Sequence, residues 1–334
     1  MILQKNLEHL YGNLYRLMIP LPNSPLKFLN SYITKSGDRN LIIDTGFNHP
    51  ECLKSMLEGI NELELDMTKT DILATHLHSD HTGLISHIIT DTSKVYMGKD
   101  ERLVFSELMA REDVLFGGHE DRLRLEGYPE EELIRTRISN PARLYKPSGM
   151  FDIISLCDGD TISYGGINWE IVETPGHTSG HICLYDSDSK TMITGDNLLF
   201  DITPNIAWSK ILLDNTLSSY LASLNKISRF EVDRALTGHR QNDGSFQGRI
   251  QELHKHHEHR LNDVLNIVGK YPYICGYDIA AKMEWSIRVK SWDDFPPGQR
   301  WFAVGEALSH INYLQNQGKL QLYKNDEGIH TYYI

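Results

Sequence analysis

Three imidazoles and a carboxylate lie close together in segment 75–83, which reads THLHSDHTG. His76 and His78 are two residues apart, so in an extended segment their side chains point to the same side and can reach one ion. Asp80 and His81 then project elsewhere and can bind a second ion nearby. Imidazole and carboxylate are ligands for Zn, Fe and Mn, and such a density of them has no use in core packing. The segment therefore predicts a metal centre rather than a group of solvated loop histidines.

Three later segments add a histidine or an aspartate to this set. His177, Asp196 and His239 each follow an apolar or β-branched run of the kind that forms a strand. Each also has a glycine beside it, which lets backbone approach a site closely. A single Gly-His or Gly-Asp pair carries little information, but this order after segment 75–83 is specific. The apolar run 71–74 predicts the buried strand that delivers the first group at a sheet edge.

Segment 75–83 resembles the H-x-H-x-D-H motif of the metallo-β-lactamase superfamily, and the three later segments resemble the turns that carry the family's other ligands. The resemblance implies an α/β fold, a metallo-β-lactamase-like αβ/βα four-layer sandwich, with two divalent metal ions. It assigns one ion to His76, His78 and His177, the second to Asp80, His81 and His239, and makes Asp196 the bridge. Zinc is the expected metal and iron or manganese are alternatives, because these ligands suit all three and no cysteine ligand favours zinc.

The resemblance also implies hydrolysis. Two cations around one water lower its pKa toward neutrality, and the resulting metal-bridging hydroxide attacks a carbonyl. Asp80 is expected to orient the hydroxide and to help pass its proton to the leaving group. No Ser or Cys nucleophile is needed, and the chain has no G-x-S-x-G motif. The leading hypothesis is therefore a hydrolase of an ester, a thioester or a lactone.

Asp44 follows a predicted strand and resembles a family residue that supports the ligand loop through hydrogen bonds. A role as a simple turn residue at the end of a strand explains Asp44 equally well.

Runs 14–19 and 29–33 also predict strands, and residues 50–65 have the apolar spacing of a helix. Strand patterns return between residues 151 and 240. Together these patterns predict a layered α/β domain with the metal ligands at one sheet edge.

Helical patterns replace the strands between residues 98 and 150, which predicts a helical insertion over the metal centre. Large apolar side chains in and near this insertion are candidates to line a substrate pocket, because such pockets are mostly apolar. These candidates are Phe105, Met109, Leu115, Phe116 and Tyr128, together with Phe200 from the segment after the last aspartate. Packing of the insertion onto the main fold, and a connecting role for Phe200, explain the same side chains equally well.

The composition changes near residue 245, so we divide the chain into a catalytic domain, 1–245, and a C-terminal domain, 246–334. Helical patterns and a terminal hairpin make the second, α+β domain resemble the winged-helix tail of one metallo-β-lactamase branch. The helix expected over 301–315 would be its recognition helix, yet it carries no Arg or Lys to contact phosphate. We therefore expect this domain to serve packing, pocket closure or formation of a homodimer.

Overall composition narrows the range of partners. The 334 residues are 40% hydrophobic with a net charge of -12, which is typical of a soluble globular protein and disfavours nucleic acid. No signal-peptide pattern or membrane-length apolar run is visible, and Cys52, Cys157, Cys183 and Cys275 are scattered as in a reducing cytoplasm. We expect a small acyl substrate. Two alternatives stay open, namely an endoribonuclease or phosphodiesterase with the same centre, and a binder of nucleic acid or a partner through the winged helix.

Overall fold

The computed structural model describes residues 6–208, 213, 215–286 and 291–334, and of residues 112–117 it describes the backbone alone. Its strands form two large sheets and one small sheet. The first large sheet has the order β1-β2-β3-β4-β5-β6-β7. Its strands are β1 (Leu7–Tyr11), β2 (Leu14–Pro20), β3 (Phe28–Thr34), β4 (Asn40–Ile43), β5 (Thr70–Leu73), β6 (Val95–Gly98) and β7 (Ile154–Leu156). Pairing is antiparallel from β1 to β4 and parallel from β4 to β7.

The second large sheet has the order β12-β11-β10-β9-β8 and packs face to face with the first. Its strands are β8 (Thr161–Tyr164), β9 (Ile167–Glu173), β10 (Ile182–Asp186), β11 (Thr191–Gly195) and β12 (Arg234–Thr237). In β9, Trp169 and Ile171 join Leu73 of β5 in the core between the sheets. Val172 belongs instead to the cluster on the outer face, because side chains alternate along a strand.

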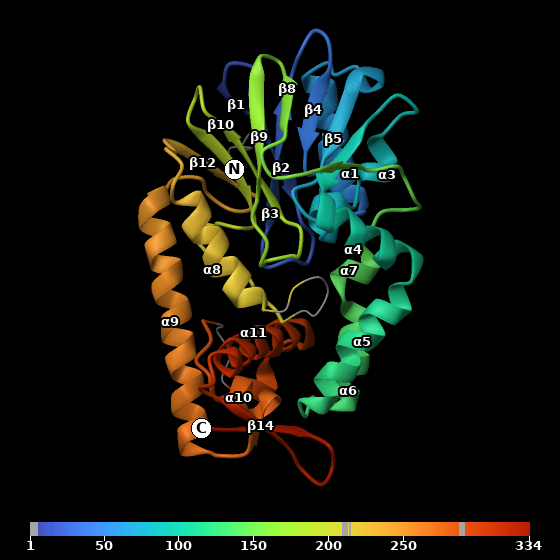
Figure 1. Cartoon of the computed structure of the whole chain (residues 1–334). Coiled ribbons are helices and arrows are strands. Elements are labelled where there is room, and N and C mark those ends of the chain that lie inside the picture. Colours follow the sequence, from blue (N-terminus) through green and yellow to red (C-terminus); the bar gives the residue numbers. More distant parts are fainter. Residues whose placement is uncertain (1–5, 209–212, 214, 287–290) are drawn as a thin grey trace.

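Helices cover the outer faces of both sheets (Figure 1). Helices α1 (Pro50–Glu62) and α3 (Ile85–Ile88) pack on the first sheet, and α8 (Thr216–Ile227) with the start of α9 (Phe246–Lys270) packs on the second. Helix α1 buries Cys52, Met56 and Ile60, whose spacing of four places them on one face. This helix–sheet–sheet–helix order agrees with the α/β sandwich expected from the sequence.

The predicted insertion folds as α4 (Lys99–Ala110), α5 (Glu112–Leu125), α6 (Glu130–Ser139) and α7 (Pro141–Leu144). The C-terminal region contains α9, α10 (Gly276–Lys282), α11 (Pro297–Asn316) and a small sheet of β13 (Ile274–Cys275), β15 (His330–Tyr333) and β14 (Gln321–Lys324). The remaining short helices are η1 (Met67–Lys69), α2 (Ser79–Thr82) and η2 (Trp292–Asp294). In Figure 1 the insertion descends along one side of the molecule and α9 along the other, and both reach α10 and α11.

The insertion and the C-terminal region share one hydrophobic core. Leu123 of α5 and Leu133 of α6 pack with Val264 of α9 and with Val304 and Leu308 of α11. These residues lie far apart along the chain, so the contact joins the insertion to the C-terminal region, which the sequence pattern predicts as two separate parts. The insertion is therefore packed against the C-terminal region as well as against the sandwich.

Buried polar contacts reinforce this junction. Glu126, which has no exposed surface, accepts hydrogen bonds from the Tyr332 hydroxyl at 2.9 Å and from His330 Nδ1 at 2.9 Å. Arg300 of α11 forms an ion pair with Glu132 of α6, and both side chains are largely buried. Because one partner in each pair comes from the insertion, the C-terminal region fixes where the insertion lies.

The C-terminal region is thus helical with a small sheet, while its winged-helix resemblance stays a prediction. The domain boundary predicted at residue 245 falls at the start of α9 and also stays a prediction, since Ile250 and Leu253 of α9 still pack on the second sheet. Among the described residues, none of the helices combines the length and the apolar character needed to span a bilayer.

Candidate metal centre

The candidate ligands lie beyond the carboxyl ends of strands from both sheets. Strand β5 leads into segment 76–81, and the turn between β9 and β10 carries His177. Strand β11 ends just before Asp196, and its parallel neighbour β12 ends two residues before His239. Parallel strands end at the same edge of a sheet, so the two sheets together bring all four segments to one place.

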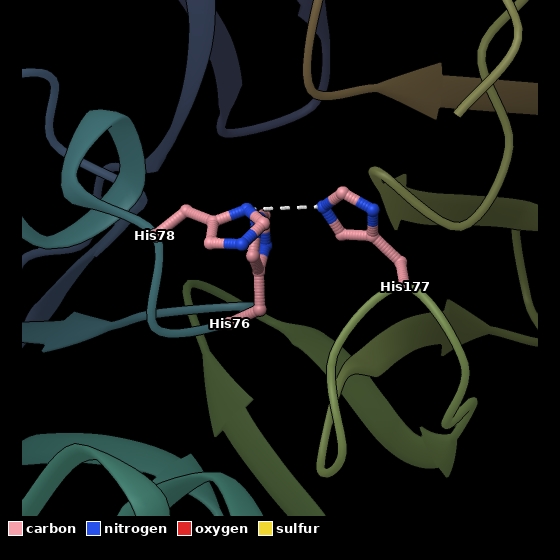
Figure 2. Close-up of side chains that lie close together, drawn as sticks. All are labelled: His76, His78 and His177. Atoms are coloured by element: carbon pink, nitrogen blue, oxygen red, sulfur yellow. Dashed lines mark hydrogen bonds between the residues drawn. The ribbon is translucent and has the colours of Figure 1, made fainter. Parts of the chain in front are cut away.

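The first group consists of His76, His78 and His177. His78 Nδ1 lies 3.0 Å from His76 Nε2 and 3.1 Å from His177 Nε2. Figure 2 shows His76 and His78 on one loop and the ring of His177 facing them from another. One nitrogen from each ring lies within 4.8 Å of the other two, which is close enough for all three to bind one ion. His76 is fully buried, whereas the other two are partly buried.

The second group consists of Asp80, His81 and His239, with Asp196 beside it. His239 Nε2 lies 3.4 Å from Asp80 Oδ2 and 3.4 Å from Asp196 Oδ2. Asp196 also faces the other histidines, with Oδ1 3.7 Å from His81 Nε2 and Oδ2 3.7 Å from His177 Nε2. Asp196 therefore lies beside members of both groups.

The outer nitrogens of three candidate ligands are held by hydrogen bonds. His81 Nδ1 lies 2.7 Å from Asp44 Oδ2, and His177 Nδ1 donates to the Asn205 carbonyl oxygen at 2.8 Å. His239 Nδ1 donates to the backbone carbonyl oxygen of residue 28 at 2.9 Å. Such contacts fix the tautomer and leave the Nε2 lone pair available to a metal.

Several inward-facing polar atoms of this centre lack a partner within the described part of the chain. His81 Nε2, His239 Nε2 and Asp196 Oδ1 are buried and form no hydrogen bond there. Buried polar atoms without partners are unfavourable, and clusters of them are rare in native proteins. Two divalent cations would satisfy these atoms together, so the residues present fit a dinuclear metal site.

Asp44 supports the ligand loop at three points. Its Oδ1 accepts the backbone N–H of Thr75 at 2.8 Å, and its Oδ2 accepts the Thr75 hydroxyl at 2.8 Å and the ring N–H of His81. Asp44 is buried and has a φ of +61°, in the left-handed region that Asp tolerates better than most residues. Asp44 therefore contacts both the first residue of the ligand loop and one candidate ligand.

Burial and neighbouring charges lower the pKa values of the histidines in the first group and raise those of the histidines in the second. Burial, followed by the neighbouring His177, lowers the pKa of His78 to about 3, and burial also lowers the pKa of His76 and of His177. These imidazoles are therefore largely neutral at pH 7, which is the form that binds metals. Burial opposes protonation of His81 and His239 as well, but nearby carboxylates outweigh it and raise both pKa values.

Comparison with known families identifies this arrangement. The family model described as the Metallo-beta-lactamase superfamily matches residues 26–239, which is more than half of the chain. The chain belongs to the metallo-beta-lactamase superfamily. The resemblance inferred from segment 75–83 is thereby confirmed, and the His and Asp clusters are consistent with the dinuclear metal site of that fold.

Similar proteins show how much of this chain is shared. A probable metallo-hydrolase of Bacillus subtilis, YqjP, is 26% identical over 309 residues, covering 87% of this chain and 89% of its own. The human acyl-coenzyme A thioesterase MBLAC2 is 26% identical over 225 residues, covering 63% of this chain and 72% of its own. A fungal lactamase-like relative is matched over only 61% of its length.

A solved structure extends the likeness to the whole fold. The crystal structure of a metallo-beta-lactamase family protein from Thermus thermophilus superposes with a TM-score of 0.83 and covers 97% of this chain and 99% of its own, at 23% identity. The insertion and the C-terminal region therefore belong to a fold that occurs elsewhere in the superfamily.

Of the predicted pocket residues, Phe105 and Met109 lie beside the metal centre. Both line a cavity of about 10 Å³ that also contacts His78, with Leu108 and Lys146 in its wall. Phe105 packs in addition against the ring of residue 151. The cavity has room for roughly one water molecule or methyl group.

The other predicted pocket residues lie elsewhere. Tyr128 packs in the core shared with the C-terminal region, where its ring contacts Tyr277 and Trp301. Phe200 packs against Gly244 and the cluster under α8. Neither lines the cavity beside His78. The side chain of Phe116 lies outside the described residues, as does that of Leu115.

Sequence reasoning missed two buried residues of this site. His181 is fully buried, lies 2.8 Å from the Thr174 hydroxyl through Nδ1, and accepts the backbone N–H of Asp196 at Nε2. Its position four residues after His177 is a sequence signal that could have identified it. Glu101 is also fully buried but carries no motif, because its partners are backbone groups that only the fold brings to it.

Proposed function

We propose that this metallo-hydrolase cleaves a thioester, or a related ester or lactone, of a small acyl substrate. The main support is that seven side chains from four separate segments converge with unpartnered, buried polar atoms at their centre. The thioesterase activity named for the human relative supports the thioester over the other two bonds. A carbonyl substrate also agrees with the net negative charge, which disfavours a polyanion.

The residues that would hold the ions follow from the two groups. We assign one ion to His76, His78 and His177, the other to Asp80, His81 and His239, and place Asp196 between them. When bound, two divalent ions lower the pKa of a shared water and polarise the substrate carbonyl.

The side chains have distinct tasks in this proposal. Burial opposes ionisation of Asp80, but the contact with His239 and the charge of His81 lower its pKa to about 2, so it stays a carboxylate at neutral pH. Asp80 then accepts a hydrogen bond from the attacking water, orients it toward the carbonyl, and passes its proton on to the leaving group. Asp44 keeps His81 in the tautomer that binds through Nε2.

The cavity beside His78 is the proposed start of the acyl pocket. Its wall is mostly apolar, and Met109 is a flexible side chain that can change rotamer to admit an acyl group. Met109→Ala should therefore raise kcat/KM for longer acyl chains relative to acetyl by about tenfold, the effect of one or two buried methylene groups. Ile138→Ala is the control, since Ile138 is on the same insertion but 70% exposed. An unchanged chain-length preference in Met109→Ala would place the acyl group elsewhere.

The structure gives little support to a nucleic-acid substrate. Helix α11, the expected recognition helix, contains Arg300 as its only Arg or Lys, and Arg300 is buried against Glu132. A winged helix that binds DNA presents such residues to solvent. We propose instead that residues 246–334 serve to hold the insertion in place over a catalytic domain of residues 1–245.

A substrate panel tests the proposed function. Zinc-loaded protein would be assayed with acyl-coenzyme A thioesters, p-nitrophenyl esters, acyl-homoserine lactones, bis-p-nitrophenyl phosphate and short RNA. We expect thioester turnover that is lost in His177→Ala and retained in the control His259→Ala, whose ring is 70% exposed on α9. Phosphodiester turnover without carbonyl-substrate turnover would overturn the proposal in favour of a nuclease.

A further inference from the structure

We propose that Glu101 is a positioning residue that holds the two histidine-bearing loops of the metal centre in place relative to each other. Glu101 lies in the first turn of α4, where the insertion leaves the sandwich, and has no exposed surface. It belongs to none of the groups that can bind an ion. This inference rests on the proposed metal-dependent function and explains a buried carboxyl group that the chemistry itself does not use.

Both oxygens of Glu101 accept backbone hydrogen bonds. Oε1 accepts the N–H of Leu77 at 2.6 Å, and Oε2 accepts the N–H of Gly180 at 2.7 Å. Leu77 lies between the first two candidate ligands, and Gly180 lies three residues after His177. A single side chain therefore joins the backbones of two loops that come from different sheets.

The backbone around Glu101 is packed so closely that two positions must be glycine. A Cβ atom on Gly180 would clash with the backbone nitrogen of Glu101, and one on Gly98 would clash with the Gly180 carbonyl oxygen. Glycine at both positions lets the start of α4 contact the His177 loop directly. This close approach is independent of the hydrogen bonds and places the Glu101 carboxyl group where both N–H groups can reach it.

A second link between the loops lies further back in the sheets. The backbone N–H of Ile182 donates to the Thr75 carbonyl oxygen at 3.0 Å and fixes the separation of the strands. Glu101 acts beyond the strand ends, at the residues that flank the ligands. Without it, the buried N–H group of Gly180 and the partly buried N–H group of Leu77 lose their acceptor, and the loops must turn to find another. Such a turn would change the 3.1 Å separation between His78 Nδ1 and His177 Nε2.

Glu101→Gln tests this role because it preserves shape and replaces one acceptor oxygen with an NH2 group facing a backbone N–H. Asp100→Asn is the matched control, since Asp100 is an exposed carboxylate in the same turn. We would measure zinc affinity by chelator competition at pH 8, the visible absorption spectrum of the cobalt-substituted protein, and kcat and KM separately. We expect Glu101→Gln to bind zinc about 10- to 100-fold more weakly, with an altered cobalt spectrum and a lower kcat at similar KM. Asp100→Asn should match wild type.

Wild-type zinc affinity and cobalt spectrum in Glu101→Gln would overturn the proposal. If the Glu101→Gln protein does not fold, Glu101→Asp replaces it in the experiment. The shorter Asp side chain keeps the carboxylate charge but reaches only one of the two N–H groups. Glu101→Asp should show an intermediate loss of zinc affinity, and wild-type affinity there would equally contradict us. The zinc and cobalt measurements need no substrate. A protein that binds zinc but hydrolyses nothing in the panel would therefore refute the proposed function and leave this test intact.

Discussion

Replacing Asp44 by Asn should remove one metal ion and leave the other. The wild-type carboxylate accepts the ring N–H of His81, so the lone pair of His81 Nε2 points toward the centre. Asn at this position can place its NH2 group against His81 Nδ1, which forces the other tautomer and puts a proton on Nε2. An imidazole in that tautomer cannot bind through Nε2.

The alternative orientation of the substituted amide is also unfavourable. Turning the amide oxygen toward His81 places the NH2 group against the Thr75 N–H, which in wild type donates to Asp44 at 2.8 Å. Leaving that buried donor unsatisfied costs about 1–3 kcal/mol. Since about 1.4 kcal/mol is a factor of ten, the second ion should bind about 10- to 100-fold more weakly. Within the described residues Asp44 forms no direct hydrogen bond with His76, His78 or His177 and reaches His76 only through the Thr75 hydroxyl, which lies 3.1 Å from His76 Nδ1, so this group should keep its ion.

Zinc titration of the Asp44→Asn protein, followed by metal analysis after gel filtration, measures this effect. We expect two equivalents in wild type and one in the variant, together with a stability loss of about 1–3 kcal/mol in urea. Asp71→Asn is the matched control. Asp71 is equally buried on β5, forms an ion pair with Arg39, accepts the Tyr164 hydroxyl at 2.6 Å and the Lys94 N–H at 2.8 Å, and has no hydrogen bond to a candidate ligand within the described residues.

The control should lose stability but keep both ions. If Asp44→Asn retained two ions at wild-type affinity, the role given to Asp44 would be wrong. If Asp71→Asn lost an ion as readily, the effect would reflect general destabilisation rather than the tautomer of His81.

Three further predictions follow from buried contacts. Burial raises the pKa of Glu101 to about 7 from 4.5, so in metal-free protein the contribution of Glu101 to stability should be full below pH 4.5 and fall by up to about 3 kcal/mol as pH rises through 7. Glu101→Gln should remove this part of the pH dependence in urea unfolding. Gly238→Ala would place a Cβ 2.5 Å from Asp196 Oδ1, and calorimetry should show weakened zinc binding with the fold retained by circular dichroism. Tyr332→Phe removes a hydrogen bond to buried Glu126, so thermal unfolding should show a loss of about 1 kcal/mol with unchanged zinc content.

Local sequence patterns predicted most elements of the sandwich. The apolar spacing over 50–65 became α1 and the run 14–19 became β2, because burial on one face leaves a clear period in the sequence. The run 29–33 became β3, which is buried along almost its whole length. Strand β13 has two residues and α2 a single turn, and neither is long enough to leave such a period.

Contacts between distant segments could not be predicted in this way. The core that joins Leu133 to Leu308 depends on how two helices meet, which no local pattern records. The same holds for Glu101, whose partners are backbone N–H groups and therefore have no sequence identity. The candidate ligands were the exception, because three His and Asp residues that each follow a glycine form a specific pattern in this order after segment 75–83, although each pair alone carries little information.

Anomalous diffraction at the zinc edge from zinc-loaded crystals tests the central claim most directly. We expect two peaks per chain, one enclosed by His76, His78 and His177 and one by Asp80, His81 and His239, with the Asp196 carboxylate between them. A single peak, or peaks away from these side chains, would contradict a dinuclear centre and the hydrolysis proposed to depend on it.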